Sequence, residues 1–239
     1  MLGKTLNVYN LNKKFGNKVV LNGISLTINK NEIFGLIGLN GAGKTTFIKT
    51  ILDLLDADSG NIEIMGLSST YTKSRQNLRY LPEKFQVSSM LKGMEFLKIF
   101  SDFNQKNENI LNEIYELADL LALDRKALSN KVSKYSKGMM QKLGLISTFL
   151  GKSDLVILDE PMSGLDPKAR ICLKELLLKS KLEGKSIFFS SHVLSDIDEI
   201  CDRIAVLNNG KLSFIGTPNE LKVKHNETLL EKAFLKEIE

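Results

Sequence analysis

A phosphate-binding motif constrains this chain more than any other stretch of its sequence. Residues 38–46 read GLNGAGKTT, which matches the pattern G-x-x-x-x-G-K-[ST]. In such a loop, glycines let backbone N–H groups converge on phosphate oxygens, and the following helix presents its positive end to the same anion. An apolar stretch at 33–37 precedes the loop, and an apolar helical face follows it. This order predicts a strand–loop–helix unit that binds a nucleotide.

Each loop residue is expected to contact a different part of the bound magnesium nucleotide. Lys44 would place a positive charge on the β- and γ-phosphates, and the Thr45 hydroxyl would coordinate Mg²⁺. Backbone amides of the loop would hold the remaining phosphate oxygens. The candidate nucleotide-binding residues here are Gly38, Leu39, Asn40, Gly41, Ala42, Gly43, Lys44, Thr45 and Thr46.

A second acidic element follows a short apolar run. Residues 155–161 read LVILDEP, so four apolar residues predict a buried strand with Asp159 at its end. Asp159 is the candidate acceptor toward Mg²⁺, and Glu160 is the candidate acceptor of a proton from an attacking water. Two adjacent carboxylates repel each other unless a cation lies nearby, so the pair itself indicates a metal.

Apolar spacing predicts strands that alternate with helices, which is typical of an α/β fold with a mostly parallel sheet. A helical insert at about 84–152 interrupts this alternation, and an amphipathic helix is expected at 228–238. A turn is expected at 58–60, and His225 lies in a polar stretch where we expect exposure to solvent. Strands are expected at 6–9, 19–28, 33–37, 61–65, 155–158, 186–190, 203–207 and 211–215.

Composition excludes several classes of protein. The apolar runs are too short to cross a bilayer, and two cysteines cannot build a disulfide framework or a four-ligand zinc site, which fits a reducing cytosol. The net charge of +5 comes from lysines scattered among acidic residues, and the chain has no Trp. These features predict no nucleic-acid partner.

Shorter motifs between and after the two phosphate-site elements resemble those of ATP-binding-cassette (ABC) ATPases. Residues 135–139, YSKGM, resemble the signature motif; residues 163–166, SGLD, resemble the D-loop; and residues 190–192, SSH, resemble the switch-histidine segment. Phe15 matches the aromatic residue that stacks on adenine. The order and spacing agree over about residues 4–224, and the chain is identified as resembling the nucleotide-binding subunit of an ABC transporter.

The resemblance implies a fold and its domain organisation. We expect a phosphate-loop NTPase (RecA-like) core with a mostly parallel sheet, a small antiparallel β subdomain and an inserted α-helical subdomain. Residues 1–224 would form a single ATPase domain, with the helical subdomain at about 84–152. Residues 225–239 would form a short C-terminal amphipathic helix.

The resemblance also implies a head-to-tail pair of subunits, either identical or closely related. ATP in the Lys44 loop of one subunit would be capped by the other subunit's signature residues, and His192 would bond the γ-phosphate and the Glu160 region. The implied catalytic residues are Glu160, His192 and Lys44. The implied signature residues are Ser136, Lys137, Gly138 and Met139, and the implied D-loop residues are Ser163, Gly164, Leu165 and Asp166.

Three positions depart from the common pattern of that family. Glu83 stands where a metal-contacting Gln is usual; a carboxylate can accept from metal-bound water, but it adds negative charge beside the triphosphate. Lys137 replaces the first signature glycine and Met139 replaces a Gln. Lys137 would either help bind the other subunit's phosphates or obstruct their close approach.

The motif at 81–83 and the tail at 228–235 look like those of bacterial exporters of drugs, antimicrobial peptides and polysaccharides. The implied partner is a separate integral membrane permease, and the implied location is the cytoplasmic face of the cell membrane. Two alternatives stay open: a non-transport ABC ATPase of the cluster-assembly type, and an ATP-sensing interaction module with little turnover.

Overall fold

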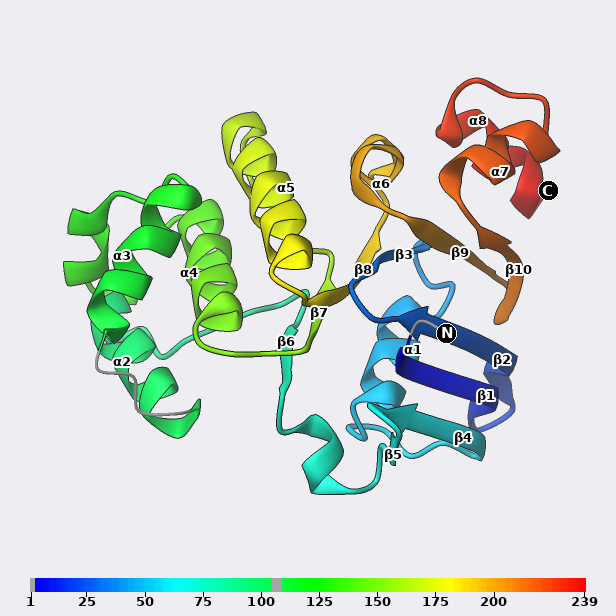
Figure 1. Ribbon diagram of the computed structural model, residues 1–239, viewed down its shortest axis with the longest axis horizontal. Coiled ribbons are helices and arrows are strands. Elements are labelled where there is room, and N and C mark those ends of the chain that lie inside the picture. The colour runs from blue at the N-terminus through cyan, green and yellow to red at the C-terminus, as the bar shows by residue number, and fades with distance from the viewer. Residues whose placement is uncertain (1–2, 105–108) are drawn as a thin grey trace.

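A six-stranded sheet lies at the centre of the fold, in a computed structural model that describes residues 3–104 and 109–239 (Figure 1). Its order is β10-β9-β3-β8-β7-β6. All neighbouring strands are parallel except β10, which pairs antiparallel with β9. The expectation of a mostly parallel sheet is therefore confirmed. The strands are β10 (Lys211–Gly216), β9 (Arg203–Asn208), β3 (Ile33–Ile37), β8 (Ser186–Ser191), β7 (Leu155–Asp159) and β6 (Leu78–Leu81).

The inner strands β3, β7 and β8 are buried on both faces, which explains why β3 and β7 read as almost continuous apolar runs. In β3, Phe34 and Leu36 belong to one apolar cluster, whereas Ile33 and Ile37 belong to the other. The two clusters lie on opposite faces because successive side chains of a strand alternate.

A four-stranded antiparallel sheet covers one cluster, in the order β2-β1-β4-β5. The helix α1 (Lys44–Ile51) adds Phe47, Ile48 and Ile51 to the apolar cluster that this sheet shares with the central sheet. The end of β3 and the start of α1 are thus fixed by packing on both sides. The antiparallel strands are β1 (Lys4–Phe15), β2 (Lys18–Asn29), β4 (Ser59–Ile64) and β5 (Leu67–Ser68).

The other cluster lies beneath helices. Three of them, α2 (Gly93–Asn104), α3 (Ile110–Leu120) and α4 (Lys137–Phe149), come between β6 and β7 and form the end of the molecule farthest from the C-terminal helices (Figure 1). The helices α5 (Pro167–Leu182) and α6 (Leu194–Ile200) follow β7 and β8. In the described part of the chain, no helix is both long and apolar enough to cross a membrane.

The C-terminal part contains two helices rather than one. The expected amphipathic helix is α8 (Leu230–Ile238), but α7 (Pro218–Lys224) precedes it and was not expected. Thr217 and Glu220 form a capping box around Pro218, a start signal that is legible in the sequence. His225 is not solvent-exposed as expected: its side chain is 17% exposed, and Nε2 lies 2.7 Å from Glu237 Oε2.

One local expectation was wrong, and one strand had not been predicted. The expected turn at 58–60 is partly strand, because β4 begins at Ser59 and pairs there with Asn12 of β1. The strand β6 was not expected at all, since its four residues include Arg79 and Tyr80 and show no clear alternation.

Candidate functional site

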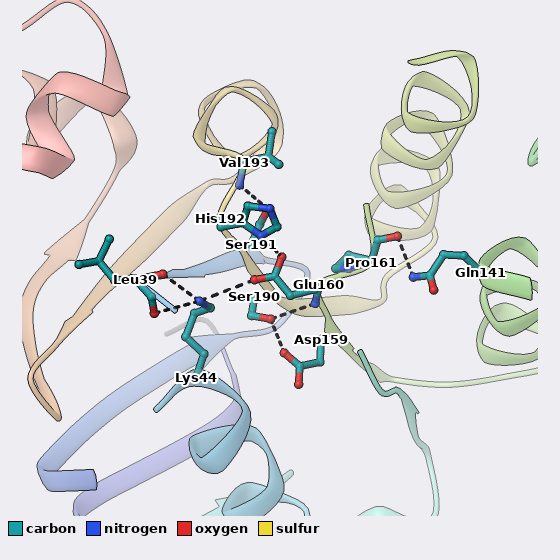
Figure 2. A network of polar contacts seen from close by, with 11 residues as sticks. Leu39, Lys44, Gln141, Asp159, Glu160, Pro161, Ser190, Ser191, His192 and Val193 are labelled. Carbon is teal, nitrogen blue, oxygen red and sulfur yellow. Dashed lines mark hydrogen bonds and ion pairs between the residues drawn. The ribbon is translucent and has the colours of Figure 1, made fainter. Parts of the chain in front are cut away.

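The phosphate-loop motif lies between β3 and α1 and runs close to β9. A Cβ at Gly38 would lie 2.5 Å from the backbone oxygen of Leu207, so only glycine fits at this position. The Lys44 ammonium turns back into the loop, where it donates to the backbone oxygens of Gly38 at 2.8 Å and Leu39 at 3.4 Å (Figure 2). Lys44 is almost fully buried. The loop therefore encloses the positive charge that a phosphate would meet.

Glu160 contacts both Lys44 and His192 (Figure 2). Glu160 Oε1 lies 3.7 Å from Lys44 Nζ, and Oε2 lies 2.7 Å from His192 Nδ1. The Glu160 backbone is left-handed, with φ of +53°, and its N–H donates to Ser190 Oγ at 3.0 Å. A left-handed non-glycine residue costs roughly 1–2 kcal/mol, and such strain collects at functional sites.

Asp159 is fully buried at the end of β7 and is only half satisfied. Ser190 Oγ donates to its Oδ1 at 2.6 Å, whereas Oδ2 has no hydrogen-bond partner among the described residues. A buried carboxylate oxygen without a donor is destabilising unless a cation reaches it. Carboxylate and hydroxyl oxygens are ligands that Mg²⁺ prefers, so Asp159 together with Thr45 on the first turn of α1 fits that ion.

No group of three or more His, Cys, Asp or Glu in the described part of the chain could hold a metal ion unaided. A magnesium site here would therefore depend on oxygens from a bound nucleotide and water, as Mg²⁺ sites of phosphate-transferring proteins usually do.

Tyr80 brings a further polar group to this site that the sequence did not indicate. Its hydroxyl is buried and has no hydrogen-bond partner within the described residues. Burial, and then the negative charges of Asp159 and Glu83, raise the pKa of Tyr80 well above its usual range. The hydroxyl thus remains a hydrogen-bond donor near two carboxylates. Glu83 itself is exposed on the loop that follows β6.

Lys44, Glu160 and His192 line a pocket of about 550 Å³. Asp159 and Tyr80 are buried behind it and are not among its described lining residues. Phe15 lies at its rim, 49% exposed at the end of β1. Lys18 and Val20 of β2 also line it and were not expected from the sequence. The lining residues are Phe15, Lys18, Val20, Asn40, Gly41, Gly43, Lys44, Thr45, Thr46, Glu83, Glu160, Ser163 and His192.

The signature residues lie apart from that pocket. Ser136 caps α4 and accepts from the Met139 N–H at 3.2 Å, and none of residues 136–139 is among the described residues that line the pocket. They adjoin the D-loop of the same chain: a Cβ at Gly138 would lie 3.0 Å from the backbone oxygen of Gly164, and the Lys137 stem lies against Gly164.

The D-loop is held between the two regions. Asp166 caps α5 by accepting from the Ala169 N–H at 2.9 Å, and Leu165 is buried. Gln141 of α4 donates to the backbone oxygen of Pro161 at 3.0 Å (Figure 2). Because Ser163 lines the pocket while Gly164 contacts the signature, this loop connects the two surfaces.

Comparison with protein families shows which family the chain belongs to. The family model described as "ABC transporter" matches residues 21–163. The chain belongs to the ABC transporter family. A solved structure described as the ATP binding subunit of an ABC transporter is 29% identical over 100% of both chains, with a TM-score of 0.91. A dimeric bacterial ABC transporter cassette, 21% identical over 89% of this chain and 98% of that one, shares the fold with a TM-score of 0.82.

Similar curated proteins agree with this placement in the ABC transporter family. ABC transporter ATP-binding proteins of Nostoc sp. and Synechocystis sp. are each 39% identical, over 92% and 83% of this chain. The chain spans 66% and 56% of the lengths of those two relatives. Nod factor export ATP-binding protein I of Burkholderia lata is 33% identical over 89% of this chain and 70% of its own length.

Proposed function

We propose that this chain binds and hydrolyses ATP as the nucleotide-binding subunit of an ABC transporter. The observation that carries the proposal is the position of Glu160, 3.7 Å from Lys44 Nζ and 2.7 Å from His192 Nδ1 at the phosphate loop. A carboxylate between a phosphate-binding cation and an imidazole has the chemistry to orient a water and accept its proton.

The catalytic residues in this proposal are Lys44, Glu160 and His192. Lys44 neutralises charge on the β- and γ-phosphates, and Glu160 accepts the proton of the attacking water at its carboxylate. His192 bonds Glu160 through Nδ1, which leaves Nε2 for the γ-phosphate. Phe15 supports the adenine ring, for which an aromatic face suffices.

Thr45 and Asp159 would hold Mg²⁺, and Glu83 is a further candidate ligand. When bound, the ion neutralises the charge that builds on the phosphate oxygens. The buried Asp159 Oδ2, to which no described residue donates, supports this assignment. Ser190, which donates to Asp159 Oδ1, keeps that oxygen aligned.

The working unit in this proposal is a head-to-tail dimer of this chain or of this chain with a close paralogue. The position of Ser136–Met139 outside the chain's own pocket supports a role toward a second subunit's ATP. The dimeric cassette with the same fold supports it as well. The exposed Lys137, at the start of α4, would add positive charge near the second subunit's phosphates.

A separate integral membrane permease is the proposed partner, and export is the proposed direction. A relative described as a Nod factor export ATP-binding protein supports export. Residues 1–224 would act as one ATPase domain at the cytoplasmic face of the cell membrane, with the helical insert at about 84–152 facing the permease and 225–239 as a C-terminal segment.

Glu160→Gln tests the hydrolytic proposal. We expect the purified variant to lose ATP hydrolysis, to retain ATP binding and to elute as a dimer with ATP and Mg²⁺. Glu175→Gln, on the exposed side of α5, is the matched control and should behave as wild type. Hydrolysis by Glu160→Gln at the original rate would overturn the assignment of Glu160.

Two further measurements separate the alternative functions. A wild-type chain that binds ATP but does not hydrolyse it, alone or with its membrane partner, would indicate an ATP-sensing module. Co-purification with a soluble assembly partner, rather than with an integral membrane protein, would indicate a cluster-assembly ATPase.

A further inference from the structure

The C-terminal helix reaches the catalytic segment. A small hollow of about 130 Å³ lies between three parts of the chain that are distant in sequence. The phosphate loop contributes one wall, residues 192–194 contribute the second, and α8 closes the third with an aromatic ring. The lining residues are Gly38, Leu39, Asn40, His192, Leu194 and Phe234.

The His192 segment depends on support from outside itself. The imidazole is 57% exposed and is held through its Nδ1 contact with Glu160. Val193, in an extended conformation, separates it from α6. This helix has only seven residues, too few to be stable alone in water, so packing of its apolar face must fix its position.

The helix α8 supplies part of that packing. It lies against α6, and its buried residues Leu230, Ala233 and Phe234 belong to the same apolar cluster as Leu194 and Ile197. Phe234 is the α8 residue that lines the hollow beside His192.

The far end of α8 is anchored independently of Phe234. Glu237 accepts from Lys224 Nζ at 2.6 Å and contacts His225 Nε2 at 2.7 Å. Asn208 of β9 donates to the backbone oxygen of Ile238 at 3.1 Å. The helix therefore has ties that should keep it docked when the Phe234 ring is removed.

We propose that Phe234 is a positioning residue that holds residues 192–194, and with them the His192 ring, against Glu160. Removing the ring enlarges the hollow and takes away one of the apolar side chains beside residues 192–194, so the Nδ1 contact to Glu160 forms in a smaller fraction of molecules. The proposal rests on the proposed function only in its kinetic part, because the ring position can be measured without turnover.

The chain offers a direct spectroscopic test, because it has only two histidines. Imidazole ¹⁵N–¹H spectra of the full chain would be recorded for wild type, Phe234→Ala and Phe234→Leu, with His192→Ala to assign the signals. We expect the His192 signals to shift or broaden in Phe234→Ala, and less in Phe234→Leu. The His225 signals should stay in place, because His225 reports on the anchored end of α8.

Leu235→Ala is the matched control, since that side chain is 54% exposed on the same helix. His192 signals identical to wild type in both Phe234 variants would overturn the proposal. A His192 shift of equal size in Leu235→Ala would also overturn it, because the effect would then be general damage to α8. If Phe234→Ala unfolds, so that the His225 signals change as well, the His192 signals of Phe234→Leu are used as the test instead.

The kinetic part uses the same variants. We expect the kcat for ATP hydrolysis to fall about tenfold in Phe234→Ala, because the displaced ring is the one that contacts Glu160 and, in the proposed function, the γ-phosphate. KM should stay within about twofold of wild type, because Lys44 and the loop amides still hold the phosphates. An unchanged kcat alongside a moved His192 signal would overturn the catalytic consequence. Absence of hydrolysis in wild type would instead count against the proposed function, and the spectra would still test the positioning.

Discussion

Lys44 Nζ lies 3.7 Å from Glu160 Oε1, and both side chains are about nine-tenths buried. The loop cation is therefore paired with the carboxylate that we propose accepts the water proton. A bound phosphate must compete for Lys44 with that carboxylate and with the backbone oxygens of Gly38 and Leu39. Phosphate binding should therefore weaken the Lys44–Glu160 ion pair.

This pairing predicts that neutralising Glu160 strengthens nucleotide binding. We expect Glu160→Gln to bind ADP about three- to tenfold more tightly, since an ion pair worth roughly 1 kcal/mol no longer opposes binding. ADP is used so that hydrolysis does not disturb the result, and titration calorimetry gives the affinity. The Glu175→Gln control should bind as wild type does. Weaker ADP binding by Glu160→Gln would show that the pair does not compete with phosphate.

Asp159→Asn separates stability from metal binding. The Oδ2 of Asp159 is buried and has no hydrogen-bond partner within residues 3–104 and 109–239, so removing the charge should stabilise the metal-free protein by about 1–2 kcal/mol. For a chain of this size, that corresponds to a rise in Tm of roughly 2–8 °C. Mg²⁺ with ADP should raise the Tm of wild type more than that of the variant. Thermal unfolding with and without Mg²⁺ checks both; a lower Tm in the metal-free variant would contradict the account of Asp159.

The sequence predicted much of the site because its motifs follow buried strands. The carboxyl ends of parallel strands meet at one edge of a sheet, so Lys44, after β3, and Asp159, at the end of β7, were expected to lie close together. Ser190 and Tyr80 were missed as parts of the site because no pattern marks a lone hydroxyl as a neighbour of a carboxylate.

The parts of the fold that the sequence did not predict are those fixed by tertiary contacts. The short strand β6 exists because it pairs with β7 along residues 155–158. The position of His225 depends on Glu237, twelve residues further along the chain, and a polar local sequence could not indicate that contact. The helix α7, by contrast, carries a capping box that sequence patterns can reveal.

Gly164 of the D-loop lies against Lys137 of the signature in the same chain, and this contact can be tested by substitution. Gly164 has φ of +76°, and a Cβ there would lie 3.0 Å from Lys137 Cε. Gly164→Ala should therefore destabilise the chain by about 1–2 kcal/mol, chiefly through the left-handed backbone. Lys137→Ala in the same background should recover only the small steric part. Urea unfolding of the two single variants and the double variant measures the coupling; full recovery would show that the backbone of Gly164 carries no strain.

Glu237 predicts how stability changes in acid. Burial would raise the pKa of this carboxyl, but hydrogen bonds from Lys224, His225 and Ser213 outweigh it and hold the pKa below its usual value of 4.5. A group with a lowered folded-state pKa stabilises the protein above its unfolded pKa, and this stabilisation is lost as pH falls through the folded value. The contribution of Glu237 should thus be complete at pH 7 and should fade below about pH 4.5.

Glu237→Gln measures that contribution. At pH 7 we expect the variant to be less stable than wild type by about 1–2 kcal/mol, because Lys224 and His225 lose a charged acceptor. The difference should shrink toward zero as pH falls through the folded-state pKa of Glu237, since the wild-type carboxyl then becomes neutral as well. Urea unfolding at a series of pH values gives both limits, with Glu231→Gln, exposed on the same helix, as the control. A difference that stays constant with pH would mean that the variant alters packing of α8 rather than the charge of Glu237.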